Sequence, residues 1–327
     1  MSLQIITAQE VRALLPMDRC IALMREAMAL EARGGAVQPI RSGLQTPDRK
    51  GGLGVMPGHI ANPAQLGVKV VTVFPGNHGT ALGSHQGMVI LFEADCGRPT
   101  AIVEARALTA VRTAAASAAA SDVLANKDAA TLAVLGCGDQ AAAHLEALAL
   151  VRDFQRTLVW GRDQAKAEAF AAAQSARLSR EIGVVASVEQ AAAVADVICT
   201  TTAAAEPVLK GAWLHEGQHL NVVGSSIPTT AEIDAEAVAR SRYFVDFEAS
   251  ARALAGDFLL AVRAGAVGED HLLGSVGQVI TGALPGRTAA SDITLFKSLG
   301  MIGEDIIAAD FVVREAARRG IGTTVDW

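Results

Sequence analysis

The sequence predicts an α/β protein of two domains, in which a doubly wound parallel sheet follows an α+β domain. Three observations lead to this prediction. The 327 residues suit about two domains of ordinary size. From residue 131 onward, short apolar runs alternate with helical segments, which is typical of a parallel sheet with crossover helices. Between residues 40 and 93, short β-branched runs are instead separated by Gly, Pro, Asn and His, which indicates a mainly antiparallel sheet.

The first domain is expected to begin with two helices, over residues 7–15 and 17–33. Apolar residues of the second helix fall near one face, and Gly34-Gly35 ends it. Apolar runs then predict strands over residues 53–56, 67–74 and 87–92. Residues 75–79 form a turn-rich loop between two of these strands.

A helix of small residues, 109–126, is expected to lead into the second domain. Six strands are expected there, over residues 132–135, 157–160, 184–186, 197–201, 219–223 and 243–245. Helices are expected from the first strand to about residue 151, and over residues 163–176 and 188–195. The tail, residues 294–319, returns to helical spacing. The predicted domains are therefore residues 1–120 and 121–299, with a C-terminal helix within 300–327 that packs back on the first domain.

The segment TLAVLGCGDQAAAHLEALA, residues 131–149, indicates what the second domain binds. A short apolar run ends in a G-x-G-x-x-A turn, and a helical run follows. Gly136 allows the tight turn, Gly138 lets the backbone approach a pyrophosphate, and Ala141 permits close packing of helix on strand. The free N–H groups at the start of the helix attract the phosphates. This order predicts a dinucleotide-binding domain of the Rossmann type, and an ordinary strand-to-helix turn is the alternative.

The end of the next strand bears on which dinucleotide binds. NAD-binding chains usually carry an acidic residue there for the ribose hydroxyls, but this chain has Gly161 followed by Arg162. A guanidinium suits a 2′-phosphate, so NADP(H) is favoured and NAD(H) stays possible. Alternatively, Arg162 is a solvated charge and Asp163 is the N-cap of the following helix, and both interpretations can hold together.

Composition and charge exclude several classes of protein. The net charge is −6 and no basic run is present, which argues against nucleic acid as a partner. The four cysteines are scattered without a C-x-x-C pair or a metal-ligand cluster, which favours inert thiols in a reducing cytoplasm over a metal site. No signal peptide and no apolar run long enough for a membrane span are visible. The expectation is a cytoplasmic protein without a membrane partner.

Three basic residues stand in apolar or small-residue surroundings: Arg41, Lys69 and Arg112. Lys69 lies within an apolar strand, and a buried lysine is rarely tolerated without a partner. In a binding cleft, a lysine can pair with a substrate carboxylate or transfer a proton when its pKa is lowered. The alternative is an edge strand with Lys69 on its solvated face. Arg112 lies near the start of the small-residue helix, and singly each of the three is more often a surface charge.

Together, several motifs closely resemble the ornithine cyclodeaminase/μ-crystallin family over essentially the whole chain. The motifs are QPIRSG, LGVMPG, GVKVVTVFPGN, Ser84-His85-Gln86, LTAVRTAAASA, LGCGDQA, VVGSSIP and TLFKSLG. The resemblance implies a homodimer in which the first domain supplies the interface and much of the substrate pocket. It implies that Arg41, Lys69 and Arg112 surround a substrate carboxylate, with Arg112 also near the cofactor.

Further site residues are implied by the same resemblance. Met56 and Ser226 would join the substrate pocket. The implied cofactor-binding residues, together with Gly136 of the glycine turn, are Ser84, His85, Arg112, Thr113, Gly138, Asp139, Gln140, Arg162, Thr202, Val223 and Ser298.

One position departs from the cyclodeaminases of the family. They carry an aspartate in the loop that here reads Gly224-Ser225-Ser226-Ile227-Pro228, and Ser226 takes its place. A neutral hydroxyl cannot replace a carboxylate base at neutral pH. The resemblance therefore favours an NADPH-dependent reductase of a small cyclic imine acid, of the Δ1-pyrroline-2-carboxylate or Δ1-piperideine-2-carboxylate type. The alternatives are an amino-acid deaminase, either a cyclodeaminase or alanine-dehydrogenase-like, and a non-catalytic NADPH-binding protein.

Overall fold

The computed structural model describes residues 2–77, 80 and 82–326. The chain divides into two compact units, which we call unit 1 and unit 2. Unit 1 comprises Met1–Arg112 with Gly300–Trp327, and unit 2 comprises Thr113–Leu299. Helix α3 (Ala105–Leu124) contributes to both, so the expected boundary at residue 120 falls inside this helix and the units divide earlier, after Arg112.

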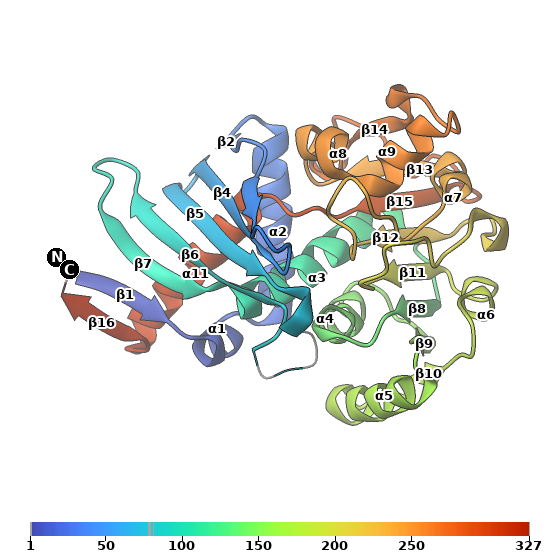
Figure 1. Ribbon diagram of the computed structural model, residues 1–327, viewed down its shortest axis with the longest axis horizontal. Helices are drawn as coiled ribbons and strands as arrows, with labels where there is room; N and C mark the ends of the chain where they lie inside the picture. Colours follow the sequence, from blue (N-terminus) through green and yellow to red (C-terminus); the bar gives the residue numbers. More distant parts are fainter. Residues whose placement is uncertain (1, 78–79, 81, 327) are drawn as a thin grey trace. The chain divides into compact units, whose positions relative to one another are not determined.

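Unit 1 is built on a mainly antiparallel sheet of order β16-β1-β7-β6-β5-β4-β2, with β3 also paired to β4 (Figure 1). Among the described strands of unit 1, β1 and β7 are the only neighbours that pair in parallel. The strands are β1 (Ser2–Ile6), β2 (Ala36–Val37), β3 (Ser42–Gln45), β4 (Gly52–Ala61), β5 (Ala64–Val73), β6 (His85–Glu93), β7 (Pro99–Glu104) and β16 (Thr323–Asp326). The predicted antiparallel sheet is thus present, with longer strands than expected.

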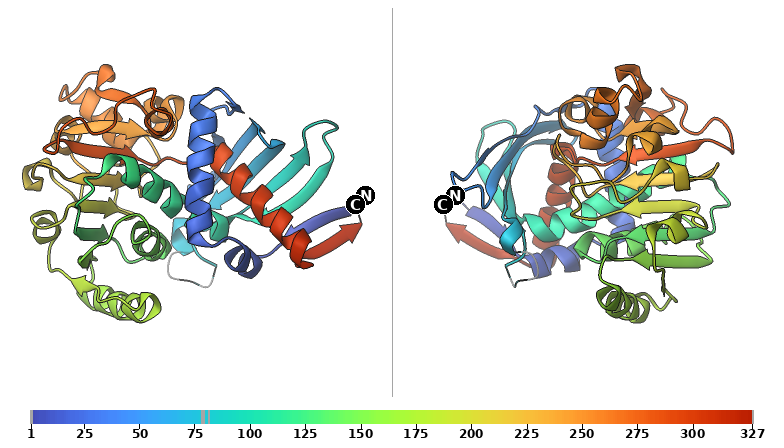
Figure 2. Two further views of the ribbon diagram at one scale, coloured as in Figure 1. Left: turned by 180° about the vertical axis from the view of Figure 1, so that it is seen from behind. Right: turned by 45° about the vertical axis from the view of Figure 1, so that its right-hand side comes forward.

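Helix α11 packs on one face of this sheet and α2 packs on α11, and the view from behind in Figure 2 shows these two helices. Besides α3, the helices of unit 1 are α1 (Ala8–Leu14), α2 (Met17–Ala32) and α11 (Ile302–Arg319), with a short 3-10 turn η1 (Pro75–Asn77). A Cβ at Gly67 would lie 2.7 Å from the Ile306 side chain, so this glycine lets α11 lie directly on β5. That close approach sets the position of the first turn of α11 against the sheet.

Unit 2 holds the predicted parallel sheet, in the order β10-β9-β8-β11-β12-β15-β13-β14. The order reverses direction between β8 and β11, which makes the sheet doubly wound. Its strands are β8 (Thr131–Leu135), β9 (Arg156–Trp160), β10 (Gly183–Val184), β11 (Val197–Thr200), β12 (His219–Val222), β13 (Ser241–Val245), β14 (Leu272–Ser275) and β15 (Ile293–Lys297). Its other elements are α4 (Asp139–Leu148), α5 (Gln164–Leu178), α6 (Val188–Ala192), η2 (Gly211–Trp213), α7 (Ala235–Ala239), α8 (Glu248–Leu254), α9 (Gly256–Arg263), η3 (Glu269–His271) and α10 (Val276–Ile280).

Two parts of the C-terminal prediction are wrong. The expected helix over residues 294–319 begins only at Ile302, because Ile293–Lys297 is strand β15 between β12 and β13. Every residue of β15 is buried, and a strand buried on both faces cannot be told from a buried helix by periodicity. Past α11, the chain turns at Gly320 (φ 64°) and adds β16 to the edge of the unit 1 sheet. Residues 300–327 are therefore only partly helical.

The loop expected over residues 75–79 is described only in part, because residues 78, 79 and 81 lie outside the described residues. Within the part of the chain that the structure describes, no helix combines the length and the apolar character needed to cross a bilayer.

Candidate functional site

Lys69 lies in the interior of unit 1. Its strand β5 runs between β4 and β6, so the alternative of an edge strand does not hold. The side chain points to the face covered by α11, where Nζ donates to Thr109 Oγ1 at 2.7 Å and to Asp305 Oδ1 at 3.1 Å. Lys69 is 4% exposed and Asp305 is fully buried, so this is a lysine paired within the core.

Arg112 contacts the same carboxylate. Its Nε donates to Asp305 Oδ1 at 3.0 Å and its Nη1 to Glu304 Oε2 at 3.0 Å, and all three side chains are buried. Arg41 approaches through Nη2, which lies 3.4 Å from the carbonyl oxygen of Gly300. The structure thus brings the three predicted basic residues together at the start of α11, and the group of Arg41, Lys69, Arg112, Glu304 and Asp305 is called the basic cluster below.

The basic cluster carries a surplus of positive charge. Two guanidinium groups and a protonated Lys69 face two carboxylates. Burial lowers the pKa of Lys69 to about 8, with Asp305 opposing and Arg112 and Arg41 reinforcing the shift. Burial alone would raise the pKa of Asp305, but the charges of Arg112 and Lys69 outweigh it and hold that pKa below its usual range. A single additional carboxylate would balance the charges of this group.

Three other predicted residues of unit 1 lie on or next to the two strands that flank β5, the strand of Lys69. They are Met56 on β4, Ser84 directly before β6 and His85 at the start of β6. Met56 on β4 is the cross-strand partner of Lys69, so the two buried side chains share one face of the sheet. Ser84 precedes β6 and its Oγ lies 3.0 Å from Nδ1 of His85. Partial desolvation, with the charges of Lys69 and Arg106, lowers the pKa of His85. The lowered pKa favours the neutral form of the His85 imidazole.

The glycine turn of unit 2 has the backbone that pyrophosphate binding requires. Gly136 has φ 130°, and a Cβ there would lie 2.6 Å from Thr201 Oγ1. Gly138 is the N-cap of α4 without a side-chain cap, and the space that its Cβ would fill is open to 4 Å. Asp139 lies in the first turn of α4, and Gln140 Oε1 is buried without a hydrogen-bond partner in the described part of the chain. These features fit the phosphates of a dinucleotide.

The end of β9 is crowded at the position where NAD-binding chains carry an acidic side chain. A Cβ at Gly161 would lie 2.7 Å from Cys137 Sγ, within the glycine turn. Asp163 accepts from Lys166 N at 3.1 Å and is the N-cap of α5, as the alternative interpretation expected. Arg162 is exposed beside it. The cap and a phosphate-binding role for Arg162 are compatible.

A buried carboxylate that the sequence did not indicate joins two further loops at this edge of the sheet. Glu232 accepts hydrogen bonds from Thr200 Oγ1 (2.7 Å), from both N (2.7 Å) and Oγ1 (2.8 Å) of Thr202, and from Gly224 N (2.5 Å). Burial raises the pKa of Glu232, while the charge of Lys297 and the hydroxyl donors oppose the rise. Thr202 follows β11 and Gly224 follows β12, so Glu232 fixes the two loops together.

Lys297 and Asp257 lie behind Glu232. Their charged atoms are 2.7 Å apart and both side chains are fully buried. Asp257 Oδ1 also accepts from the backbone N–H of Glu232 at 2.8 Å. Asp257 therefore links the Lys297 ion pair to the backbone of Glu232, and these three residues support the carboxyl ends of β11, β12 and β15. We call Lys297, Asp257 and Glu232 the buried charge chain.

The remaining predicted residues of unit 2 lie mostly at the same edge of its sheet. Val223 follows β12 and donates to Thr200 O at 3.0 Å, and the buried Ser298 follows β15. Thr113 is buried on α3. In the loop after β12, the neighbour Ser225 bonds Thr230, and Ser226 is the next, half-buried residue. The cofactor-binding residues predicted in unit 2, apart from Thr113, thus gather where parallel strands end.

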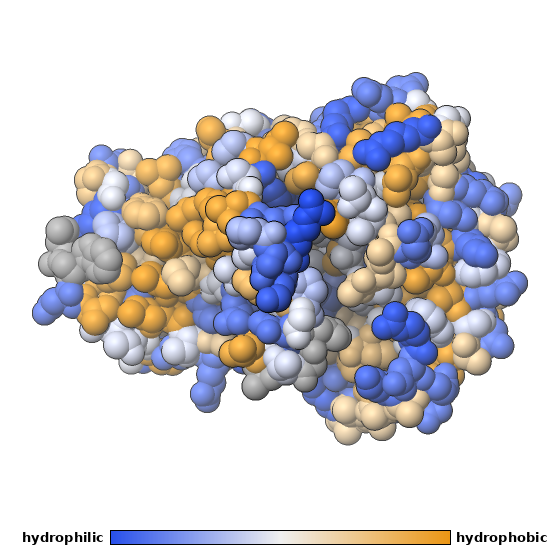
Figure 3. All heavy atoms as spheres, in the orientation of Figure 1, coloured by the Kyte–Doolittle hydropathy of each residue, from blue (hydrophilic) through white to orange (hydrophobic). Residues whose placement is uncertain are grey.

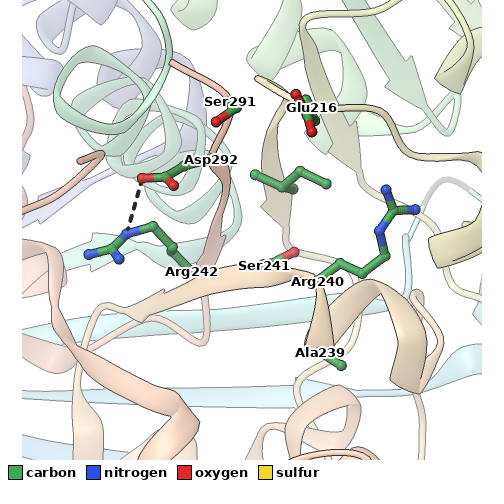
Figure 4. A pocket seen from close by; sticks show the side chains of 8 residues that line it. Glu216, Ala239, Arg240, Ser241, Arg242, Ser291 and Asp292 are labelled. Atoms are coloured by element: carbon green, nitrogen blue, oxygen red, sulfur yellow. Dashed lines mark ion pairs between the residues drawn. The ribbon is translucent and has the colours of Figure 1, made fainter. Parts of the chain in front are cut away.

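A groove of about 420 Å³ lies at the opposite edge of this sheet, where β13 and β15 begin (Figure 4). Glu216, Ala239, Arg240, Ser241, Arg242, Ser291, Asp292 and Ile293 line it. Arg242 and Asp292 form an ion pair of 3.5 Å across it. Ligands of doubly wound sheets bind at the carboxyl ends of the strands, so we assign this groove no part in cofactor binding.

The doubly wound sheet and its glycine turn define a dinucleotide-binding α/β protein, and the basic cluster adds a site suited to a carboxylate. The chain belongs to the ornithine cyclodeaminase/mu-crystallin family, whose sequence pattern matches residues 1–320. The resemblance drawn from the motifs is confirmed.

Several known proteins resemble this chain over most of their length. The chain is 38% identical to the mouse ketimine reductase mu-crystallin over 279 residues, which is 85% of each protein. Δ1-Pyrroline-2-carboxylate reductase from Thermococcus litoralis, solved with NADH and L-proline, is 32% identical with a TM-score of 0.96, over 98% of this chain and all of that one. An archaeal alanine dehydrogenase, solved as a dimer with NAD, is 31% identical with a TM-score of 0.94 over the whole of both chains.

Proposed function

We propose that this protein is an NAD(P)H-dependent reductase of a small cyclic imine acid. The observation that carries the proposal is the basic cluster, in which Lys69 and Arg112 are held by one buried carboxylate and positive charge remains in surplus. An imine acid of the Δ1-pyrroline-2-carboxylate type supplies the balancing carboxylate and a nitrogen that must gain a proton. The relatives named for reduction of such imines support the same choice.

The roles of the residues follow from their chemistry. Arg41 and Arg112 hold the carboxylate, since guanidinium groups stay charged and bind carboxylates through paired N–H donors. Lys69 hydrogen-bonds the substrate or donates the proton that the imine nitrogen takes up, because its pKa of about 8 suits proton transfer near neutral pH. When bound, the reduced nicotinamide supplies a hydride to the imine carbon. Arg112 and Thr113 are consecutive on α3, the helix shared by both units.

The cofactor site is assigned to the carboxyl edge of the unit 2 sheet. Gly136, Gly138, Asp139 and Gln140 would hold the pyrophosphate, because their turn is open to a ligand and its helix end is uncapped. The residues after β11, β12 and β15, with Arg112, Thr113, Ser84 and His85, complete the proposed cofactor set, apart from Arg162. We favour NADP(H) over NAD(H) because Arg162 stands where an acidic residue would select NAD.

The first test measures NADPH and NADH oxidation at neutral pH with Δ1-pyrroline-2-carboxylate. We expect faster turnover with NADPH. In Arg162→Ala, we expect the KM for NADPH to rise about 10- to 100-fold with little change for NADH, because a charge-assisted hydrogen bond contributes about 1.5–3 kcal/mol. Arg156→Ala is the matched control, since Arg156 is exposed at the other end of the same strand β9.

Other outcomes of that assay reassign the function in definite ways. Turnover with NADH alone keeps the reductase and removes the role of Arg162. Absence of turnover with either cofactor, together with ammonia release from ornithine in catalytic NAD, indicates a cyclodeaminase. Ser226 argues against that result, because a hydroxyl at this position cannot act as the carboxylate base. NADPH binding without any turnover indicates a non-catalytic binding protein.

We further propose that the protein is a homodimer through the open face of the unit 1 sheet. Because Gly67 and Lys69 face α11, their neighbours in β5 point the other way. The register across β3 to β7 then places the following side chains on that open face: Leu44, Val55, Leu66, Val68, Val70, Met88, Ile90, Phe92 and Ile102. Figure 3 shows apolar side chains gathered over these strands. So large an apolar face fits a second copy of the chain, and the dimer reported for the alanine dehydrogenase supports this.

The test of the dimer places a charge on the open face. Met88 is 42% exposed on β6, so Met88→Glu should convert the dimer to a monomer in sedimentation velocity with little loss of folded structure. Leu150→Glu is the matched control, because Leu150 is 54% exposed in unit 2. A monomeric wild-type protein, or a Met88→Glu variant that stays dimeric, would exclude this interface.

We also propose a cytoplasmic location. The four cysteines are free thiols, of which Cys20 and Cys199 are buried, as suits a reducing compartment.

A further inference from the structure

We infer that Asp305 is the positioning residue of the basic cluster, holding Lys69 and Arg112 in place for the substrate carboxylate through one shared oxygen. This inference rests on the proposed function and goes beyond it, because Asp305 itself is assigned no contact with substrate. Its Oδ1 accepts from Lys69 Nζ at 3.1 Å and from Arg112 Nε at 3.0 Å. One atom that accepts from both cations fixes their separation.

The backbone places Asp305 there. It lies in the first turn of α11, after the left-handed Gly300 (φ 76°). A Cβ at Gly300 would lie 2.7 Å from Arg112 Nη1, so the turn and the guanidinium are packed in contact. Gly67 lets α11 lie directly on β5, which brings Asp305 next to Lys69. The carboxylate therefore has a position determined by the fold rather than by a mobile side chain.

The surroundings of Asp305 argue for more than a structural ion pair. It is fully buried, and its second oxygen, Oδ2, has no hydrogen-bond partner among the described residues. A buried ion pair that served stability alone would gain from using both oxygens. Asp305 instead uses Oδ1 for both cations of the proposed reaction, while Oδ2 accepts no hydrogen bond from the described residues.

The charge of Asp305 also keeps Lys69 protonated. The charged and titratable groups that act on Lys69 come from several elements: Asp305 (α11), Arg112 (α3), Arg41 (before β3) and His85 (β6). Glu304 (α11) and Cys20 (α2) lie next to Arg112. Burial and the two arginines lower the pKa of Lys69, and Asp305 is the largest influence that raises it. Without Asp305, Lys69 would lose its proton at a lower pH and could neither bind the carboxylate as a cation nor donate a proton.

The test replaces Asp305 with asparagine, which keeps the shape and removes the charge. We expect the pKa of Lys69 to fall, and the basic limb of the kcat/KM profile to move to lower pH by about one unit or more, as expected for the loss of a neighbouring opposite charge. The chain has six lysines, so the pKa of Lys69 can be followed by NMR of 13Cε-labelled lysine, with Lys69→Met assigning the signal. This readout needs no substrate.

Asp310→Asn is the matched control. Asp310 is a buried aspartate of the same helix that pairs with the exposed Arg314, outside the basic cluster. We expect no movement of the Lys69 pKa or of the basic limb in that variant. A Lys69 pKa that is the same in Asp305→Asn as in the wild type would overturn the inference. If no imine is reduced at all, the proposed function fails, and the NMR titration still decides the role of Asp305.

Asp305→Glu tests the inference even if Asp305→Asn does not fold. It keeps the charge and moves it by one methylene, so KM for the imine acid should rise at least tenfold while the basic limb stays in place. An unchanged KM would show that the position of the carboxylate is unimportant.

Discussion

Replacing Lys69 with methionine should lower kcat/KM for the imine acid by about 10²- to 10⁴-fold, the range that a positioned proton donor contributes. Methionine fills a similar volume in the buried site but carries no charge. The change takes the basic cluster from a positive surplus to neutrality, so the carboxylate of the substrate also loses an attraction. Steady-state kinetics over a pH series would separate the two losses, since lost attraction raises KM and a lost proton donor lowers kcat.

The fold should tolerate this change. Asp305 keeps its hydrogen bond from Arg112 when Lys69 is gone, so no buried carboxylate is left without a cation. Dissociation constants for NADPH should stay close to the wild-type value, because the glycine turn lies in unit 2. Lys50→Met is the control, since Lys50 is an exposed residue of unit 1 that pairs with Asp48 at 3.0 Å, outside the basic cluster. Full reductase activity in Lys69→Met would remove Lys69 from the mechanism.

The pH dependence of the wild-type enzyme follows from the same residue. The pKa of Lys69 is about 8 against an ordinary 10.5, and the protonated form is the one that binds and donates. Activity that depends on it is therefore present below about pH 8 and is lost as the pH rises through that value. In Lys69→Met this basic limb should be missing from the profile of the residual activity.

The sequence was most informative at residues whose type has a single physical explanation, such as a glycine in a tight turn or a lysine within an apolar strand. The turn Gly136-Cys137-Gly138 stood between a strand and a helix, and Lys69 lay in an apolar strand that needed a partner for it. Those features located the glycine turn and the centre of the basic cluster. Strand β15 was mistaken for helix, because a run buried on both faces has no alternation of apolar and polar residues to read.

The partners of the predicted cations were the part that could not be predicted. Lys69 and Asp305 are 236 positions apart in the chain, and no local pattern joins them. A weak signal did exist, since Glu304 and Asp305 are adjacent acids inside the apolar run MIGEDII, where charges need buried partners. The partners of Glu232 and Asp257 were equally unpredictable, because Thr200 and Lys297 stand at the ends of β11 and β15 and reach these carboxylates only when the parallel sheet forms.

The buried charge chain leads to the largest expected effect on stability. Lys297→Met should lower the free energy of unfolding by about 3–5 kcal/mol, because it leaves the buried Asp257 without its cation. It should also raise the pKa of Glu232 further, since Lys297 opposes the effect of burial on that carboxylate. Protonated Glu232 would then hold the backbone N–H groups of Thr202 and Gly224 less well, so NADPH affinity should fall together with stability.

Two variants separate the buried charge from other causes. The double variant Lys297→Met/Asp257→Asn should recover part of the loss, because a neutral amide oxygen can still accept from Glu232 N without an unpaired charge. Arg252→Met breaks an exposed pair with Glu248, at 3.8 Å and with side chains 42% and 41% exposed, and should change stability by less than about 1 kcal/mol. Urea denaturation followed by fluorescence measures the stabilities, and NADPH titration measures the affinity. If Lys297→Met unfolded at the urea concentration of the wild type, the ion pair would contribute nothing, and the loops after β11 and β12 would owe their positions to Glu232 and its hydroxyl and backbone N–H donors.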